Sequence, residues 1–566
     1  MKIFKLFPLA CAALMMSACG SDNDIEGGAT NPAGDAQYLA VNIVNVGTTP
    51  TRALTGDYQD GSTEESKINK IRFYFFNNDG SPYILNGTTP DINWLENSSI
   101  TNNGKDTPNG IEQITKSILV INGTVKTAPA KMVAIINPET LTELDNTKKT
   151  LAQLTGSLMD TKFYNTTGTT PNDFVMSNSV YATSEGLKVC ENKISGFVYS
   201  DATNATAHPV DIYVERVAAK VKASLTGAEF QDGASTWGAG KKGIKVGSYS
   251  TYDIYAIVDG WGVADENGKA NLEKQIQTSW SDTGLGFSTW TTADFHRSFW
   301  ETSVPFSATN NIVNHKFTDY TKHPDEFLYT LPNTSATAIP APATPVNPSD
   351  PTIYKNDRTK FLLTAHLMYN DGTSWKNAEL CTYKGIDYLG VDKLKDLIAF
   401  ESGYYVEDAT STSPAGHKRI TGADITFVKP TGKADYLVVP ALVDDAKTYY
   451  INTGTEATPR WEPVTGADAN TALANETAQV RTEGKTYYFI PIKHLGTDNT
   501  IAEYGIVRNH IYDVKVKNIA GFGTPVCLPN EVIIPTMPED QSTYLAARIN
   551  VLQWRVVEQK VDLGKK

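Results

Sequence analysis

Apolar and polar residues alternate over short stretches of this chain, which is the pattern of strands with one buried face. Leu39, Val41 and Ile43 alternate in this way within the run 38–46. The run 131–138 is apolar over most of its length, which predicts a strand that is buried on both faces. The pattern therefore predicts a protein built from β-sheets.

Some segments leave the type of element open. The segment 210–223 begins with clear alternation, but Val217–Val221 also fits a helix. The segment 141–158 allows a short helix, and Asn77-Asn-Asp-Gly80 fits a tight turn after a strand. We find no internal repeat. Further strands are predicted in the apolar runs 70–76, 253–258, 361–372, 487–492 and 504–519.

The last stretch, 544–563, is rich in β-branched and aromatic residues and predicts a long strand. Its alternation changes phase after Val551, which suggests a bulge or a crossing between sheets. The preceding segment 527–542 contains three prolines, which keep the chain extended because proline cannot donate a ladder hydrogen bond. A strand on such an arm can extend beyond its own domain, or it can be the ordinary last strand of its own sandwich.

Composition narrows the class of protein. A chain of 566 residues is long enough for two or three domains, and its 27 tyrosines and 42 glycines favour an all-β protein. The formal charge of −13 and the lack of a basic stripe argue against a nucleic-acid partner.

The N-terminus has the features of an export signal. Lys2 and Lys5 precede the apolar run 6–16, and the small residues before Cys19 complete a lipobox. Residues 1–18 are then a signal peptide, and Cys19 becomes the lipidated first residue of the exported protein. The alternative is a plain secretory signal that is cleaved nearby. The remaining cysteines, Cys190, Cys381 and Cys527, are too few for a disulfide framework, and at most one pair could form.

Catalytic and cofactor motifs are not found in the sequence, and the eight histidines do not cluster at the spacing of metal ligands. We therefore expect no enzyme, no cofactor and no metal. The fragments 77–80 and 265–268 resemble parts of calcium loops but are more typical of turns. An alternative function rests on four tryptophans, which could stack on sugar rings or could instead be core residues: Trp261, Trp280, Trp290 and Trp300.

Several segments together resemble the major-subunit family of Bacteroidales type V fimbriae, in particular the shaft subunit of the short (minor) fimbriae. The segments occur in the order of the family along nearly the whole chain. They are the lipobox at Cys19, the loop Thr51-Arg52-Ala53, Tyr213-Val-Glu-Arg-Val-Ala-Ala-Lys220, Leu331-Pro-Asn-Thr334, Gly505-Ile-Val-Arg-Asn-His-Ile-Tyr-Asp-Val-Lys-Val-Lys517 and Ile549-Asn-Val-Leu-Gln-Trp-Arg-Val556.

The resemblance implies two transthyretin-like, Greek-key β-sandwich domains and a C-terminal donor strand. It implies a lipoprotein precursor at the outer membrane, from which an arginine-specific protease removes the first strand by cutting between Arg52 and Ala53. The exposed groove would accept the C-terminal strand of another subunit, and such a head-to-tail contact builds a filament. The donor residues would be Ile549, Val551, Leu552, Trp554 and Val556.

The resulting organisation is a lipidated propeptide with the first strand at 19–52, an N-terminal domain at 53–209, a C-terminal domain at 210–526 and an arm with the donor strand at 527–566. The expected partners are identical subunits, accessory anchor or tip subunits, the protease and, before maturation, the outer membrane. The resemblance implies that the mature subunit lies in an extracellular fimbria that supports adhesion and biofilm formation. The alternatives are a glycan-binding surface lipoprotein and a fimbrial anchor or tip component.

Overall fold

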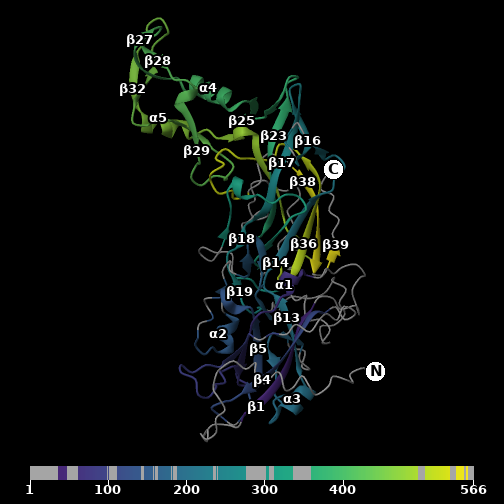
Figure 1. The fold of residues 1–566 in the computed structure, drawn as a ribbon. Helices are drawn as coiled ribbons and strands as arrows, with labels where there is room; N and C mark the ends of the chain where they lie inside the picture. Colours follow the sequence, from purple (N-terminus) through teal and green to yellow (C-terminus); the bar gives the residue numbers. More distant parts are fainter. Residues whose placement is uncertain are drawn as a thin grey trace.

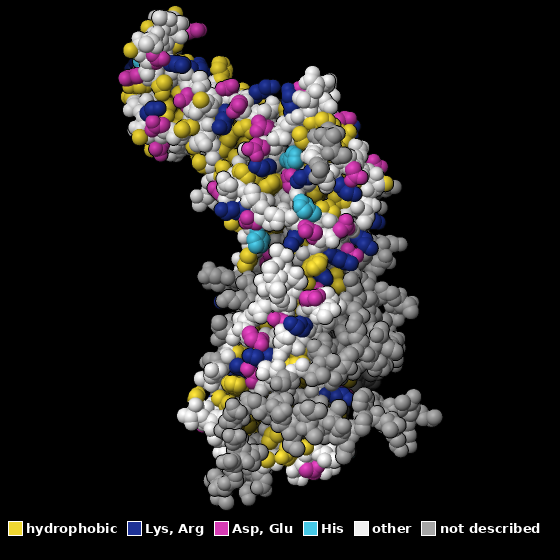
Figure 2. All heavy atoms as spheres, in the orientation of Figure 1, with side chains coloured by type: hydrophobic (Ala, Val, Ile, Leu, Met, Phe, Trp, Pro, Cys, Tyr) yellow, Lys and Arg dark blue, Asp and Glu magenta, His cyan; other side chains and the backbone are white. Residues whose placement is uncertain are grey.

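The computed structural model describes residues 36–46, 61–100, 111–275, 301–304, 312–334, 358–494, 504–535, 544–553 and 556–558, apart from short gaps inside the second and third ranges. Strands dominate, so the expected all-β class is confirmed. Within these ranges, no helix is both long and apolar enough to span a membrane. Acidic and basic side chains are interspersed over the middle and upper parts of the face drawn in Figure 2.

The molecule is elongated and has three successive parts, each with its own apolar core (Figure 1). The first part contains one large sheet with the strand order β3-β2-β5-β9-β13-β1-β4 and with β12 beside β5. Its strands are β1 (Gln37–Val46), β2 (Ile71–Phe76), β3 (Trp94–Asn97), β4 (Ile111–Ile121), β5 (Lys131–Ile136), β9 (Met176–Asn178), β12 (Asn192–Lys193) and β13 (Val210–Arg216).

Short elements cover this sheet and join it to the second part. The helices are α1 (Thr63–Ser66), α2 (Leu151–Thr155) and α3 (Ala202–Ala207). The capping box at α1, in which the Ser62 and Glu65 side chains bond each other's backbone N–H, explains why the helix begins there. Small paired strands are β7 (Asn165–Thr167) with β8 (Thr170–Asn172), β10 (Tyr181–Ala182) with β11 (Lys188–Val189), and β6 (Leu158–Met159) with β19 (Ala270–Asn271).

The second part is a β-sandwich, because a single core lies between a sheet of order β21-β14-β36-β38-β39 and a sheet of order β15-β16-β17-β23-β34-β37. Val221 and Val514 enter this core from the first sheet, and Ile254 and Phe361 enter it from the second. The strands of the first sheet are β14 (Ala219–Leu225), β21 (Phe327–Thr330), β36 (His510–Ala520), β38 (Tyr544–Gln553) and β39 (Val556–Glu558). Those of the second are β15 (Gln231–Asp232), β16 (Lys242–Tyr249), β17 (Tyr252–Ala264), β23 (Lys360–Asn370), β34 (Lys485–Pro491), β37 (Thr524–Pro525) and, beside β23, β24 (Trp375–Asn377).

The third part, which the sequence did not predict, is an insertion between β24 and β34. It forms the green tip in Figure 1. Its core packs α4 (Val391–Ser402) and α5 (Gly466–Leu473) against small sheets. These sheets contain β25 (Leu380–Tyr383), β26 (Ile386–Leu389), β27 (Tyr404–Thr412), β28 (Ala415–Arg419), β29 (Ile425–Val428), β30 (Val439–Leu442), β31 (Thr448–Asn452), β32 (Trp461–Thr465) and β33 (Ala478–Val480). Two further pairs, β18 (Glu266–Asn267) with β20 (Ile312–Val313) and β22 (Asn333–Thr334) with β35 (Gly505–Ile506), lie in the second part.

The structure settles the segments that the pattern left open. Val217–Val221 is not a helix, because the chain leaves β13 after Arg216 and enters β14 at Ala219. The segment 141–158 does contain a short helix, α2. The expected boundary at 210 stays a prediction, although β13, which begins there, pairs with strands of the first sheet.

Candidate functional site: the first strand and the C-terminal strand

The first strand lies inside its sheet, between two other strands. β1 pairs in parallel with β13, from Val41 opposite Val210 to Asn45 opposite Val214. It pairs antiparallel with β4 along its whole length, from Gln37 opposite Ile121. Within the described sheet, β4 is joined to the other strands through β1.

One face of β1 is part of the core of the first sheet. Leu39, Val41 and Ile43 are 0%, 1% and 0% exposed, which confirms the alternation predicted from the sequence. Burying side chains of this size contributes about 1.5–3 kcal/mol for each. On the other face, the Asn42 side-chain amide donates a hydrogen bond of 2.7 Å to the carboxylate of Asp211 on β13.

Removal of β1 would therefore leave a slot in the middle of a sheet. β13 and β4 would each lose a ladder partner, and unpaired N–H and C=O groups are costly where water cannot replace the partner. The core around Leu39, Val41 and Ile43 would open at the same time. We call this space, bounded by β13 and β4, the β1 slot.

The residues expected at the processing sites fall outside the described ranges. These residues are Cys19, Arg52 and Ala53. β1 ends at Val46, six residues before Arg52 in the sequence. Their roles stay predictions.

The C-terminal strand lies in the sheet of its own sandwich. β38 pairs antiparallel with β36, from His510 opposite Gln553 to Ala520 opposite Tyr544, and β39 folds back on its other side. Of the expected donor residues, Ile549, Val551 and Leu552 lie in β38, and Val556 lies in β39 opposite Leu552. Trp554 lies outside the described residues.

The phase change after Val551 does not coincide with a bulge in the described strand. β38 continues to Gln553 in register with β36, and the register shift lies between Val516 and Asn518 of β36. The chain then turns back into β39, which begins at Val556. The change of phase therefore marks the approach to a hairpin.

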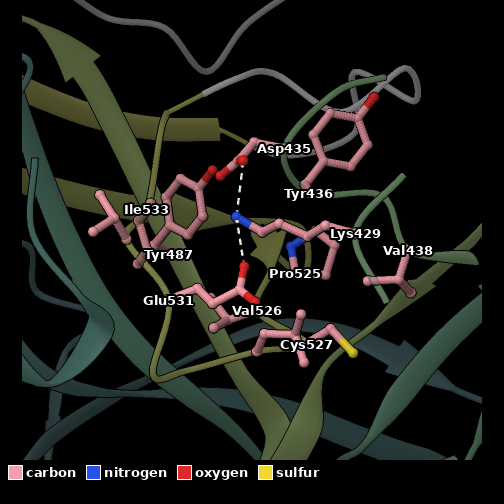
Figure 3. A pocket seen from close by; sticks show the side chains of 12 residues that line it. Lys429, Asp435, Tyr436, Val438, Tyr487, Pro525, Val526, Cys527, Glu531 and Ile533 are labelled. Carbon is pink, nitrogen blue, oxygen red and sulfur yellow. Dashed lines mark hydrogen bonds and ion pairs between the residues drawn. The ribbon is translucent and has the colours of Figure 1, made fainter. Parts of the chain in front are cut away.

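The segment before β38 is attached to the second and third parts. Pro525 pairs with Thr486 on β34, and Val526 and Ile533 are each 5% exposed. Figure 3 shows Lys429 of the insertion between two carboxylates, at 2.9 Å from Asp435 and 3.2 Å from Glu531.

Asp435 also accepts a hydrogen bond of 3.1 Å from the backbone N–H of Ile534. Although burial lowers it, the pKa of Lys429 is raised overall by its bonds to Asp435 and Glu531, so this group is a cation at neutral pH. We call the contacts of Lys429 and Asp435 with residues 531–534 the arm clasp.

Two of the sequence motifs meet in a buried polar joint between the first and second parts. From the motif 213–220, Arg216 donates to the Glu65 carbonyl at 2.7 Å and to the Asn509 side chain at 3.2 Å. From the motif 505–517, the Arg508 guanidinium lies 2.8 Å from the Glu301 carboxylate, and both side chains are almost fully buried.

Further charged groups of this joint are paired across the two parts. Glu215 forms a buried ion pair of 2.9 Å with Lys274, and Lys220 forms one of 2.8 Å with Glu65. Burial raises the pKa of Glu273 to about 8, and its carboxyl group accepts a hydrogen bond of 3.2 Å from the Thr155 hydroxyl. Sequence patterns missed this joint, because its bonded partners lie far apart in the sequence; Arg216 and Asn509, for example, are 293 positions apart.

Trp261 cannot be part of a sugar-stacking platform. The side chain is 1% exposed, packs in the sandwich core and donates to the His323 carbonyl at 2.7 Å. The use of Trp261 for glycan binding is therefore wrong, and Trp280, Trp290 and Trp300 lie outside the described residues. No group of three or more potential metal ligands was found in the described ranges.

Two family models match the sequence, one at each end. The model of the major fimbrial subunit protein (FimA) matches residues 38–226, and that of the C-terminal part of the type IV major fimbrial subunit protein, fimbrillin, matches residues 480–560. Both models describe major fimbrial subunits, so the chain is similar to this family over these two segments. The two matches contain β1, β13, β36 and β38, whereas the insertion that carries α4 and α5 lies between them.

Structures of fimbrial proteins are among the similar ones. A fimbrilin (FimA) from Porphyromonas gingivalis W83 is 12% identical with a TM-score of 0.36, and the match covers 92% of this chain and 98% of that one. The tip fimbrial protein Mfa3 from Porphyromonas gingivalis, with a C-terminal truncation, is 11% identical with a TM-score of 0.29, covering 90% and 99%. A fimbrial assembly protein from Parabacteroides distasonis ATCC 8503 is 11% identical with a TM-score of 0.23, covering 75% and 99%. Among curated proteins, the sequence search finds no match.

Proposed function

We propose that this chain is the repeating structural subunit of a cell-surface fimbria. Export as a lipoprotein through Cys19, cleavage after Arg52 and strand exchange would convert the monomer into a filament that supports adhesion. The observation that supports this most is the position of β1 between β13 and β4, with Leu39, Val41 and Ile43 in the core.

A first strand of this kind is necessary for the fold of the monomer, but another strand can take its place. It completes the sheet while the subunit is exported as a monomer, and it protects the core until cleavage. Its loss leaves a binding site whose natural occupant is another strand, because only a strand supplies backbone donors and acceptors to both neighbours. The polymer is open-ended, because the slot and the donor strand are different surfaces of the same chain.

The donor strand would come from β38 of a second copy. Release of β38 breaks its long ladder with β36 and its short ladder with β39. Entry into the slot forms new ladders with β13 and β4. The exchange therefore gains backbone pairing and buries the opened core. We expect accessory anchor and tip subunits to use the same kind of contact at the filament ends.

Intact mass and gel mobility without boiling test this function. The purified precursor is measured before and after treatment with a trace of arginine-specific protease. We expect loss of the segment that ends at Arg52, followed by a ladder of oligomers that resist the detergent. A precursor that is cut at Arg52 and stays monomeric at high concentration would contradict strand exchange.

A further inference from the structure

The sequences of the first strand and the C-terminal strand correspond residue by residue. β1 contains Tyr38-Leu-Ala-Val-Asn-Ile-Val-Asn-Val46, and β38 begins Tyr544-Leu-Ala-Ala-Arg-Ile-Asn-Val-Leu552. Four of the first six residues are identical, and each strand has 10 residues. This alignment matches Leu545 with Leu39, Ala547 with Val41 and Ile549 with Ile43.

The correspondence has the same chain direction in both strands. A strand that enters the slot in this direction runs parallel to β13 and antiparallel to β4, as β1 does. Side chains alternate between the two faces of a strand, so a shift by one residue would turn every apolar side chain out of the core. The matched register instead presents Leu545 and Ile549 to the core positions that Leu39 and Ile43 occupy.

We infer that the C-terminal strand of one subunit replaces β1 of the next in the same direction and register, with Tyr544 taking the place of Tyr38. The inference rests on the proposed function, and it adds to that function the residues that determine where the donor stops. Specificity then lies in the apolar pair Leu545 and Ile549 and in the polar position of Arg548.

The charges at this polar position support the same register. In the sheet of its own subunit, Arg548 lies opposite Lys515, and like charges directly across a strand pair are unfavourable. In the slot, Arg548 would stand where Asn42 now donates to the Asp211 carboxylate. Lys116 lies opposite the same position on β4, so the attraction to Asp211 is partly offset. The exchange replaces one like-charged neighbour of Arg548, Lys515, by another, Lys116, and places Arg548 opposite the Asp211 carboxylate.

A disulfide across the subunit contact tests the register. The double variant Arg548→Cys with Asp211→Cys is matured by the protease and oxidised, and then boiled in detergent without reductant. We expect a covalent ladder, because the Cα partners of strand neighbours lie within disulfide range. The two positions lie in different sheets of one monomer, so the uncut precursor should give no internal cross-link.

The matched control is Asn550→Cys with Asp211→Cys, in which the cysteine of the donor strand lies two residues further along the same face. The inferred register places position 550 where Val44 now lies opposite Tyr213, so this variant should give at least tenfold less cross-linked material. The parent chain, which keeps Cys190, Cys381 and Cys527, shows the background.

The possible results distinguish a wrong register from a wrong proposed function. A polymer that forms in both variants but cross-links only through position 550 would establish a slip by two residues and overturn the inference. A polymer without a cross-link at either position would overturn the inferred register. A parent chain that forms no polymer after cleavage would instead contradict the proposed function.

Discussion

β1 and β38 are strands of equal length and similar sequence, but their surroundings differ. β1 has a long neighbour on each side and three side chains in a closed core. β38 has one long neighbour, β36, and on its other side the three-residue strand β39. The comparison shows that β1 has more backbone pairing on its two sides than β38, which would favour the proposed exchange.

Blocking the removal of β1 should have the largest effect. With Arg52→Ala, the slot stays filled and we expect no detergent-resistant oligomers at any concentration of the arginine-specific protease. The monomer should unfold at the same temperature as the parent precursor, measured by circular dichroism. Arg52→Lys combined with a lysine-specific protease is the matched control and should restore the ladder. Oligomers of Arg52→Ala without cleavage would show that the two strands do not compete for one site.

A charge on the apolar face of the donor strand should have the next largest effect. Ile549→Asp would bring a carboxylate to the buried position of Ile43, and an unpaired buried charge costs several kcal/mol. We expect polymerisation to fall by more than about a hundredfold, which corresponds to roughly 3 kcal/mol. Arg548→Ala, one position away on the other face, should change it less than about fivefold. Equal effects of the two substitutions would contradict a one-sided donor strand.

The buried joint should make stability depend on pH. The folded pKa of Glu273, about 8, lies above the ordinary value of 4.5, so the folded state binds more protons than the unfolded state between these values. Stability from this group is therefore present below about pH 4.5 and is lost as the pH rises towards 8. Glu273→Gln should remove this dependence and raise the free energy of unfolding at pH 8 by on the order of 1–3 kcal/mol.

Chemical denaturation of the precursor at pH 5 and pH 8 measures this effect. Thr155→Val is the control, because it removes the hydroxyl that donates to Glu273 and keeps the carboxyl group. A Glu273→Gln variant with the same pH dependence as the parent would show that another group of the joint carries the change.

The smallest predicted effect concerns Ala547, which is smaller than the core residue of β1 that it would replace. Ala547 would stand where Val41 is 1% exposed, so the donor strand leaves space there. Ala547→Val should stabilise the subunit contact by about 1 kcal/mol, seen as a higher temperature at which the oligomers dissociate in detergent. Arg548→Lys, on the opposite face at the position of Asn42, which is only half-buried, should leave this temperature unchanged. A lower temperature for Ala547→Val would indicate that the register differs.

Alternating apolar residues were enough to predict the strands that matter most. The alternation of Leu39, Val41 and Ile43 predicted a strand with one buried face. The apolar run 131–138 predicted β5, of which five of six residues are buried. Local patterns carry such information because a strand repeats every two residues. The position of β1 between β13 and β4 could not be predicted in this way, since its partners are far away in the sequence.

The joint and the insertion show where local patterns fail. Arg508 and Glu215 are charged, and composition rules place such residues at the surface unless a partner is known. Their partners, Glu301 and Lys274, come from other elements and become apparent only after folding. In the insertion, α4 has only three buried residues, so its apolar stripe is too short to stand out in the sequence.

The arm clasp would also set a length scale for the proposed fibre. Because Lys429 and Asp435 hold the chain as far as Ile534, only the nine residues from 535 to 543 can act as a leash for the strand that begins at Tyr544. Ten steps along an extended chain span at most about 35 Å. In the proposed fibre this length would limit how far the exchanged strand can lie from the clasp of its own subunit.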